Sequence, residues 1–171
     1  MCRFYFRREW NRIRALVGEL SSNGLVPNLV TFTHLASSCQ NTHETVQLLT
    51  DMEKFGAHPN TFLLNTLLSK GANTNRPEML HYVLKRFETY ELTPDEHTIK
   101  KCERFIQRYR KLVVSIERKD LKALSEFSKS EVKFVEKYYN SEKWMNFLAF
   151  YEDFKASNYA LKPGANLKIP R

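Results

Sequence analysis

The sequence has little glycine and proline and no long apolar run. Five glycines and six prolines among 171 residues leave few of the turns that a sheet-rich fold needs. No stretch approaches the roughly 20 apolar residues that cross a bilayer, so we expect no membrane span. Cys2, Cys39 and Cys102 lack CxxC or Cys/His clustering, which argues against disulfides and zinc and predicts free, buried thiols in a reducing compartment.

Catalytic motifs are also missing from the sequence. It contains no phosphate-cradling glycine loop and no nucleophile motif. After Glu96 the only aspartates are Asp120 and Asp153, which are too far apart in the sequence to suggest the carboxylate cluster of a metal-dependent nuclease. We therefore expect a protein that is not an enzyme and that needs no metal or cofactor.

The formal net charge of +8 is unevenly distributed. Basic residues outnumber acidic ones in residues 1–14 and 96–143, whereas residues 15–95 are mildly acidic. Basic flanks are typical of a protein with a polyanionic partner, but solvated helix faces produce the same pattern. Charge alone leaves both interpretations open.

A repeating unit is the strongest signal in the chain. Pro27-Asn28, Pro59-Asn60 and Pro94-Asp95 recur at offsets of 32 and 35 residues. Apolar residues keep the same helical register before and after each of these turns, which predicts two amphipathic helices per unit. The fold class is therefore an all-α solenoid of helix-turn-helix repeats. The register residues are Ile13/Val17/Leu20, Thr45/Leu49/Met52 and Leu80/Leu84/Phe87 before the turns, and Phe32/Leu35, Leu64/Leu67 and Ile99/Cys102 after them.

The helix ends carry recognisable signals. Asn41 with Glu44, and Asn75 with Glu78, have the spacing of an N-cap and a reciprocal glutamate. Each pair predicts the start of the second helix of a unit.

The turns that end these second helices contain glycine twice. Gly24 and Gly56 supply the left-handed residue that stops a helix, and a proline follows three residues later. The third unit has Glu91 at this position, so we expect a less tight turn there.

The tandem resembles the pentatricopeptide repeat family. Its first full unit, "LVTFTHLASSC…ETVQLLTDMEKFGAHPN", follows the family's Val-Thr-Tyr-Asn-x-Leu-Ile start and its Met-x-x-x-Gly-x-x-Pro-Asp/Asn finish. The second unit keeps "NTLL" and "TPD" but departs at "TFLL" and lacks the Met and Gly. The resemblance runs from Ile13 to about Ile106. The related tetratricopeptide pattern fits less well, because Thr45 and Leu80 stand where that pattern wants small residues.

The repeat divides the chain into five expected parts. The arginine-rich start resembles a mitochondrial presequence. Phe6, Trp10 and Val17 nevertheless continue the apolar face of a second helix, so we interpret it as part of a truncated unit, and expect the chain to be part of a longer array or a shortened product of one. The C-terminal aromatic residues are either base-stacking platforms or the packed core of a cap, and we favour the cap because a solenoid end needs covering. The expected parts are 1–28, a second helix of a truncated repeat; 29–60 and 61–95, two full repeats; 96–118, a degenerate repeat with a basic helix; and 119–171, a helical cap and irregular tail.

The resemblance implies binding of single-stranded RNA, with one nucleotide read per repeat. In the family scheme the fifth and last residues of a unit face the base edge, and the second residue packs against base faces. By that analogy a Thr/Asn pair favours adenine and an Asn/Asp pair favours uracil. The implied residues are Asn28 for the truncated unit, Val30, Thr33 and Asn60 for the first full unit, and Phe62, Asn65 and Asp95 for the second.

Alternatives remain for these residues and for the basic helix that follows. The polar residues could be exposed helix positions and N-caps, and only the repeat tips the interpretation toward base reading. Lys100 departs from the family code and cannot accept a hydrogen bond, so we assign it to phosphate contact. The basic stripe either follows a phosphate backbone or simply faces solvent. Its other cations are Lys101, Arg104, Arg108 and Lys111, of which the first three are the candidate RNA-binding residues.

The expected function is therefore that of an RNA-binding repeat protein. The resemblance implies a place in the mitochondrial matrix, in RNA processing, including tRNA processing, in RNA stability or in translation. It also implies mitochondrial ribosomes or RNA-processing proteins as further partners. The alternative is a helical-repeat scaffold that binds proteins and reads no base.

Overall fold

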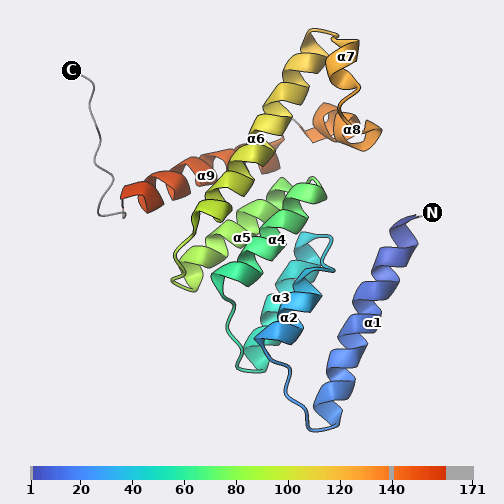
Figure 1. The fold of residues 1–171 in the computed structure, drawn as a ribbon, viewed down its shortest axis with the longest axis vertical. Helices are drawn as coiled ribbons and strands as arrows, with labels where there is room; N and C mark the ends of the chain where they lie inside the picture. Colours follow the sequence, from blue (N-terminus) through green and yellow to red (C-terminus); the bar gives the residue numbers. More distant parts are fainter. Residues whose placement is uncertain (1, 139–140, 161–171) are drawn as a thin grey trace.

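The computed structural model describes residues 2–138 and 141–160 of the chain. Within that part the structure is helical and contains no strand (Figure 1). The side chains of Cys2, Phe6 and Ile13, and the expected irregular tail at 161–171, lie outside the described residues. The helices are α1 (Cys2–Ser22), α2 (Leu29–Ala36), α3 (Thr42–Lys54), α4 (Thr61–Asn73), α5 (Pro77–Thr89), α6 (Glu96–Glu117), α7 (Leu121–Leu124), α8 (Lys129–Tyr138) and α9 (Glu142–Ala160).

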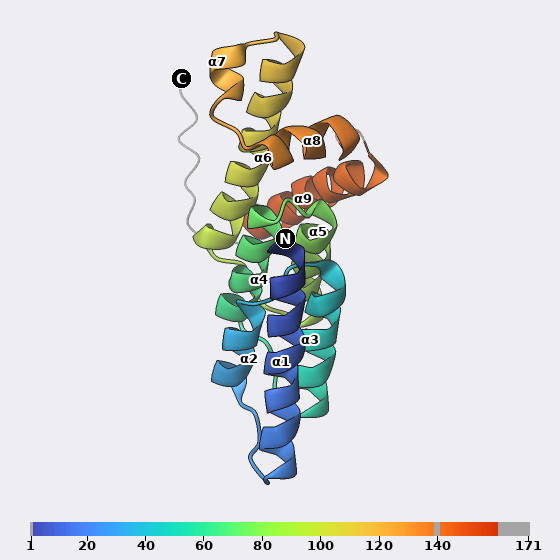
Figure 2. The same cartoon turned by 90° about the vertical axis from the view of Figure 1, so that its right-hand side faces the viewer.

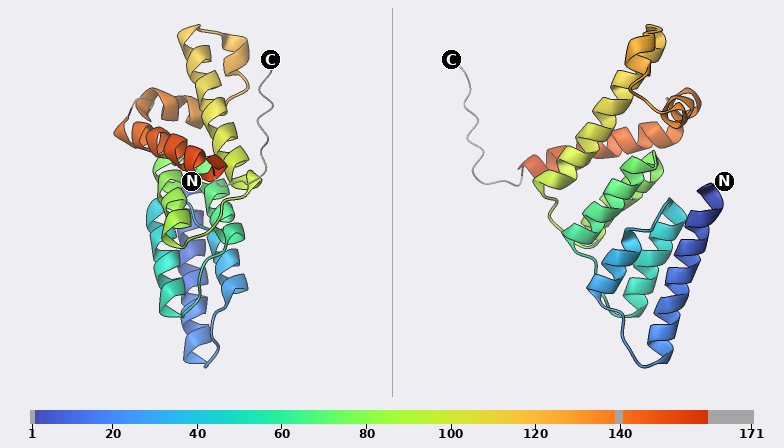
Figure 3. Two further views of the ribbon diagram at one scale, coloured as in Figure 1. Left: turned by 90° about the vertical axis from the view of Figure 1, so that its left-hand side faces the viewer. Right: turned by 45° about the vertical axis from the view of Figure 1, so that its right-hand side comes forward.

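The helices form stacked pairs, as the repeat predicts. α2 packs on α3 and α4 packs on α5, while α4 lies between α2 and α6. Figure 3 shows α1, the α2–α3 pair, the α4–α5 pair and α6 following one another across the molecule. Trp10 and Val17 of α1 are buried, so this helix contributes to the same core. The prediction of an all-α helical-repeat fold is confirmed.

The turns that end α1, α3 and α5 have one backbone geometry. Gly24, Gly56 and Glu91 all have positive φ, at 77°, 67° and 52°. In each turn the residue after the left-handed one donates its backbone N–H to the carbonyl oxygen of the residue five positions before it. The three N···O distances are 2.9 Å, for Leu25 to Leu20, Ala57 to Met52 and Leu92 to Phe87. The expectation of a looser turn at Glu91 is therefore wrong. Glycine adopts this left-handed conformation without a steric penalty. Glu91 adopts it despite its side chain, because the hydrogen-bonded turn requires it.

One of the two expected N-caps forms and the other does not. The Asn41 side chain accepts the Glu44 amide at 2.9 Å, and the Glu44 carboxylate reaches back to the Gln40 amide at 2.7 Å. Asn75 instead has a positive φ of 56°, and Arg76 occupies the position before α5 without a side-chain cap bond. The prediction of Asn75 as a cap is wrong, because the chain needs a left-handed residue there to leave α4.

The densest packing lies between α4 and α5. Their facing leucines and methionine are fully buried, and Gly71 allows the two helices to approach. A Cβ atom at Gly71 would stand 3.3 Å from the Leu80 side chain and 3.4 Å from the Leu80 backbone nitrogen. The buried residues of this contact are Leu63, Leu64, Leu67, Leu68, Met79, Leu80, Val83 and Leu84.

Helix α9 covers the outer face of α5 and completes the cap. It packs directly on α5, and the short helix α7 and helix α8 precede it in the chain (Figure 2). Phe154 meets Phe87 of α5 edge-on, with ring centroids 6.0 Å apart. Lys155 bonds Glu103 of α6 at 2.5 Å. The cap prediction is confirmed, and the aromatic residues Trp144, Phe147, Tyr151 and Phe154 are buried core residues.

Candidate nucleic-acid interface

The first helices of the repeats, α2, α4 and α6, lie side by side and form the surface on which the predicted site residues gather (Figure 1). We call this surface the α2–α4–α6 face. Val30 on α2 and Phe62 on α4 occupy equivalent positions, 32 residues apart, and are 62% and 67% exposed. Both positions therefore present a large apolar side chain to solvent on the same face of the repeat.

The predicted readers Asn65 and Asp95 are joined in a hydrogen-bonded network at the seam between α4 and α6. Asn65 Nδ2 donates to Asp95 Oδ1 at 3.0 Å. The Thr98 hydroxyl lies 2.8 Å from both Asn65 Oδ1 and Asp95 Oδ1. Lys101 Nζ donates to the Asn65 carbonyl oxygen at 2.9 Å. Asn65 is only 6% exposed, so this seam holds its amide in place and presents mainly the Asp95 carboxylate to solvent.

The Asp95 carboxylate is held ionised. Burial acts to raise its pKa, but hydrogen bonds from the Thr98 backbone and from the Asn65 and Thr98 side chains outweigh burial and lower the pKa below its ordinary value. The bonds described for the carboxylate all end on Oδ1. Oδ2 is therefore an available acceptor at the edge of the network.

The corresponding pair in the preceding unit is not bonded in this way. The Thr33 hydroxyl donates to the Leu29 carbonyl oxygen at 2.8 Å, and Asn60 Oδ1 caps α4 by accepting the Leu63 amide at 2.9 Å. The Asn60 amide nitrogen makes no bond with the described residues, so it is available as a donor. Asn28 caps α2 through the Thr31 amide at 3.1 Å. Capping and base reading are therefore compatible, because a cap uses only the side-chain oxygen.

The four predicted cations of α6 differ in their partners. Lys100 pairs with Glu96 at 2.7 Å within the helix, and Lys101 bonds the Asn65 carbonyl. Burial lowers the pKa of Lys101. Arg108 pairs with Glu131 of α8, whereas the Arg104 side chain makes no hydrogen bond or ion pair with the described residues.

Three of these cations line a pocket of about 610 Å³ that the sequence did not predict. It lies where the end of α4, the middle of α6 and the first turn of α8 meet. The lining residues that sequence reasoning missed are the polar Ser69, Asn73, Asn75, Ser128, Ser130 and Glu131. No local sequence pattern predicts that these residues lie beside the basic helix, because the pocket forms only when α8 folds back against α6.

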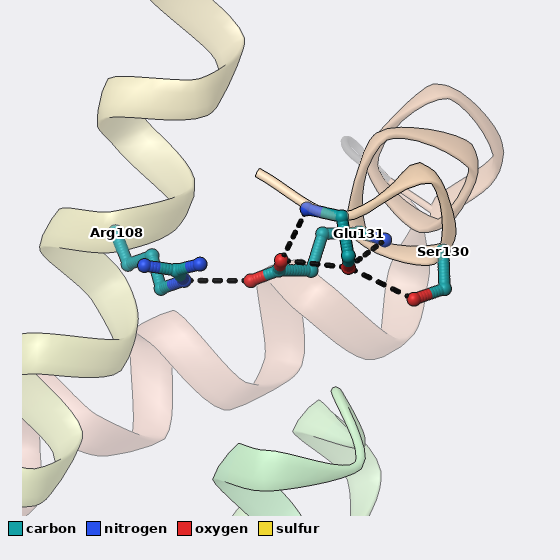
Figure 4. A network of polar contacts seen from close by, with 4 residues as sticks. Arg108, Ser130 and Glu131 are labelled. Carbon is teal, nitrogen blue, oxygen red and sulfur yellow. Dashed lines mark hydrogen bonds and ion pairs between the residues drawn. The ribbon is translucent and has the colours of Figure 1, made fainter. Parts of the chain in front are cut away.

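The Arg108–Glu131 pair fixes that fold-back (Figure 4). Arg108 Nε donates to Glu131 Oε1 at 2.6 Å, and Glu131 Oε2 accepts the Ser128 amide at 2.8 Å. Glu131 and Ser128 thus form a capping box at the start of α8, and Glu131 ties this helix to α6. The Arg108 hydrogen bond is the main reason that the pKa of Glu131 falls to about 2 from an ordinary 4.5.

Replacing Glu131 by Gln should remove a pH-dependent part of the stability. Because the folded-state pKa of Glu131 is depressed, its stabilisation is fully present above about pH 4.5 and is lost as pH falls toward 2. Arg108 is half exposed, so solvent screening limits the difference to about 0.5–1 kcal/mol at pH 7. Urea unfolding of both proteins from pH 7 to pH 2.5 checks this. A wild-type advantage that stays constant over that range would contradict the assigned role.

Comparison with known proteins identifies relatives for about half of the chain. Pentatricopeptide repeat-containing protein 1, mitochondrial, from Homo sapiens is 34% identical over 90 residues, which is 53% of this chain and 13% of the human protein. The proteins of that name from Pongo abelii and Rattus norvegicus are each 33% identical over the same lengths. No family model and no solved structure matches the chain. With its paired helices and repeated turns, the chain is thus similar, over about half its length, to a mitochondrial pentatricopeptide repeat protein, which confirms the resemblance that the sequence predicted.

Proposed function

We propose that this chain binds single-stranded RNA on the α2–α4–α6 face and acts without catalysis of its own. The observation that carries the proposal is the seam between α4 and α6. There Phe62 presents an exposed aromatic ring on the same helix as Asn65. Asn65 is hydrogen-bonded to the ionised Asp95, and α6, with its basic residues, begins directly after Asp95. Single-stranded RNA offers a partner for each, namely a base face, a base edge and a phosphate.

At this seam the polar groups favour one kind of base edge. Asp95 Oδ2 is an acceptor only, so it pairs with an edge that presents an N–H donor, as uracil does at N3. Asn65 holds the carboxylate by donating to Oδ1, and in this proposal it acts by orienting Asp95. The preceding seam offers the Asn60 amide as a donor and the Thr33 hydroxyl, a combination suited to adenine.

The cations of α6 supply sequence-independent attraction. Lys100, Lys101, Arg104 and Arg108 follow the helix from the seam toward the pocket, in the order in which a phosphate backbone would meet them. Arg104 needs to break no internal bond to contact a phosphate. Val30, Phe62 and the cations would therefore hold the strand, while Asn28, Thr33, Asn60, Asn65 and Asp95 would select bases.

The names of the relatives support a mitochondrial setting. We place the chain in the matrix, in processing of transcripts, including tRNA, or in their stability or translation, with ribosomes or processing factors as protein partners. No helix in the described part of the chain is long and apolar enough to cross a membrane. The second candidate, a protein-binding scaffold, is favoured by the same exposed Val30 and Phe62, which would suit an apolar peptide equally well.

Fluorescence anisotropy with labelled RNA separates the two candidates. We expect single-stranded RNA pools to bind more tightly than a duplex of equal length, with an affinity that falls as salt rises. Two full repeats bury little surface, so the expected dissociation constants are of micromolar order. An absence of salt-sensitive binding in every pool, at protein concentrations where the fold is intact, would favour the scaffold.

A further inference from the structure

The pocket between α4, α6 and α8 is a second polar site, continuous with the α4–α6 seam. Lys101 belongs to both, because its Nζ bonds the Asn65 carbonyl at 2.9 Å and its side chain lines the pocket. From there the wall continues along α6 through Arg104 and Arg108. Its volume of about 610 Å³ lies within the range of about 300–1,000 Å³ typical of ligand pockets.

The charges in the pocket are not balanced. Lys101, Arg104 and Arg108 face a single carboxylate, Glu131, which Arg108 neutralises. Lys101 also faces the ionised Asp95 of the seam, so Arg104 is the cation left without a partner, and it has no bond with the described residues that a ligand would have to replace. A protein keeps such charges at little cost only where water or an anion can reach them.

On the side away from the seam, the pocket is bounded by the segment that contains α7 and α8, through Ser128, Ser130 and Glu131. The Arg108 guanidinium lies 4.9 Å from the centroid of the Phe127 ring, and Lys111 bonds Glu126 at 2.6 Å. These contacts hold the segment over the second half of α6. The groove that starts at the seam therefore ends at the first turn of α8.

A buried polar group also remains unused at this end. Tyr109 lines the pocket and is buried, yet its hydroxyl has no hydrogen-bond partner among the described residues. Buried polar groups normally bind protein or water, so this hydroxyl is available to a ligand atom or to a bridging water. In the α8 wall the Ser128 hydroxyl donates to Glu131 Oε2 at 2.7 Å and lies 2.9 Å from the Ser130 hydroxyl, so these two groups are already engaged with one another.

We propose that this pocket holds the terminal phosphate of a single-stranded RNA, so that the chain recognises a strand end as well as a sequence. The proposal rests on the RNA-binding function proposed above. A phosphate inside a strand carries one negative charge and continues on both sides, whereas a terminal phosphate carries up to two and needs an exit on one side only. The unpaired Arg104, with Lys101 beside it, suits the higher charge of the terminal group, and the wall at the start of α8 suits a strand that leaves on one side only.

The test compares RNAs of one sequence that carry a 5′-phosphate, a 3′-phosphate or hydroxyls at both ends. We expect one of the phosphorylated forms to bind the wild type about tenfold more tightly than the hydroxyl form, the gain of one or two charge-assisted hydrogen bonds. Whichever end gives the gain identifies the direction of the strand. Equal affinity of all three RNAs would overturn the proposal while leaving RNA binding intact, and binding of none would instead overturn the proposed function.

A matched pair of variants assigns the effect to the pocket. Arg104→Gln should reduce the advantage of the phosphorylated RNA to less than about twofold, because it removes the unpaired cation. Arg110→Gln removes the same charge from α6 at a position outside this pocket and should keep the advantage. Loss of the advantage in both variants, or in neither, would contradict the assignment. Both side chains are exposed, so unfolding is not expected to obscure the result.

Discussion

Replacing Phe105 by Ala should lower the free energy of unfolding by about 3–5 kcal/mol, the range for a buried aromatic residue cut back to alanine. Phe105 is 5% exposed and lies at the centre of the contact between α6 and α9. Its ring centroid is 4.8 Å from that of Tyr109, 5.8 Å from Trp144 and 5.9 Å from Phe147. The loss would leave a cavity that these rigid rings cannot close, and would loosen α9. Urea unfolding followed by circular dichroism measures the change.

The chain offers a matched control for this prediction. Phe62→Ala is the same substitution at a position that is 67% exposed, so it should change the free energy of unfolding by less than about 0.5 kcal/mol. Similar losses in the two variants would contradict the packing described for α6 and α9.

Phe62→Ala should instead weaken binding of single-stranded RNA by about 5- to 100-fold. Stacking of one base on an aromatic side chain contributes about 1–3 kcal/mol, and Phe62 is the exposed ring on the α2–α4–α6 face. The change should leave the salt dependence of binding unaltered, because no cation is lost. Anisotropy titrations of both proteins at two salt concentrations measure both quantities.

Met145→Ala serves as the control, because Met145 is an exposed apolar residue on α9, outside the proposed surface. Its RNA affinity should stay within about twofold of the wild type. If the Phe62 and Met145 variants bind alike, Phe62 is not a stacking residue and the proposed surface is wrong.

The repeat could be predicted from the sequence because its signals are local. A glycine or a proline restricts only its own turn, so Gly56 and Pro59 reveal where one unit ends and the next begins. Local signals fail where several residues can meet the same need. Glu91 adopts the left-handed turn conformation that is usual for glycine. Asn75, which we expected to cap α5, has a left-handed conformation instead, and Arg76 stands in the cap position.

The remaining features depend on distant contacts. The partner of Arg108 is 23 residues away, and the partner of Glu103 is 52 residues away. Helical spacing shows that α8 and α9 are amphipathic or aromatic-rich helices, but it does not indicate which face of the repeats each one covers. The hydrogen bond between Asn65 and Asp95 could not be predicted either, because the repeat register places both residues in the unit but does not determine the distance between their side chains.

The most direct test of base reading at the α4–α6 seam is a change of base preference. The double variant Asn65→Thr/Asp95→Asn gives this seam the Thr/Asn pair that stands at Thr33 and Asn60. Short RNAs that differ at one base, scanned through every position, would be competed against a labelled strand for the wild type and the variant. We expect the preference at one position to change from uracil to adenine and the other positions to stay as they are. An unchanged preference at every position, in a variant that still folds and binds RNA, would contradict base reading by Asn65 and Asp95.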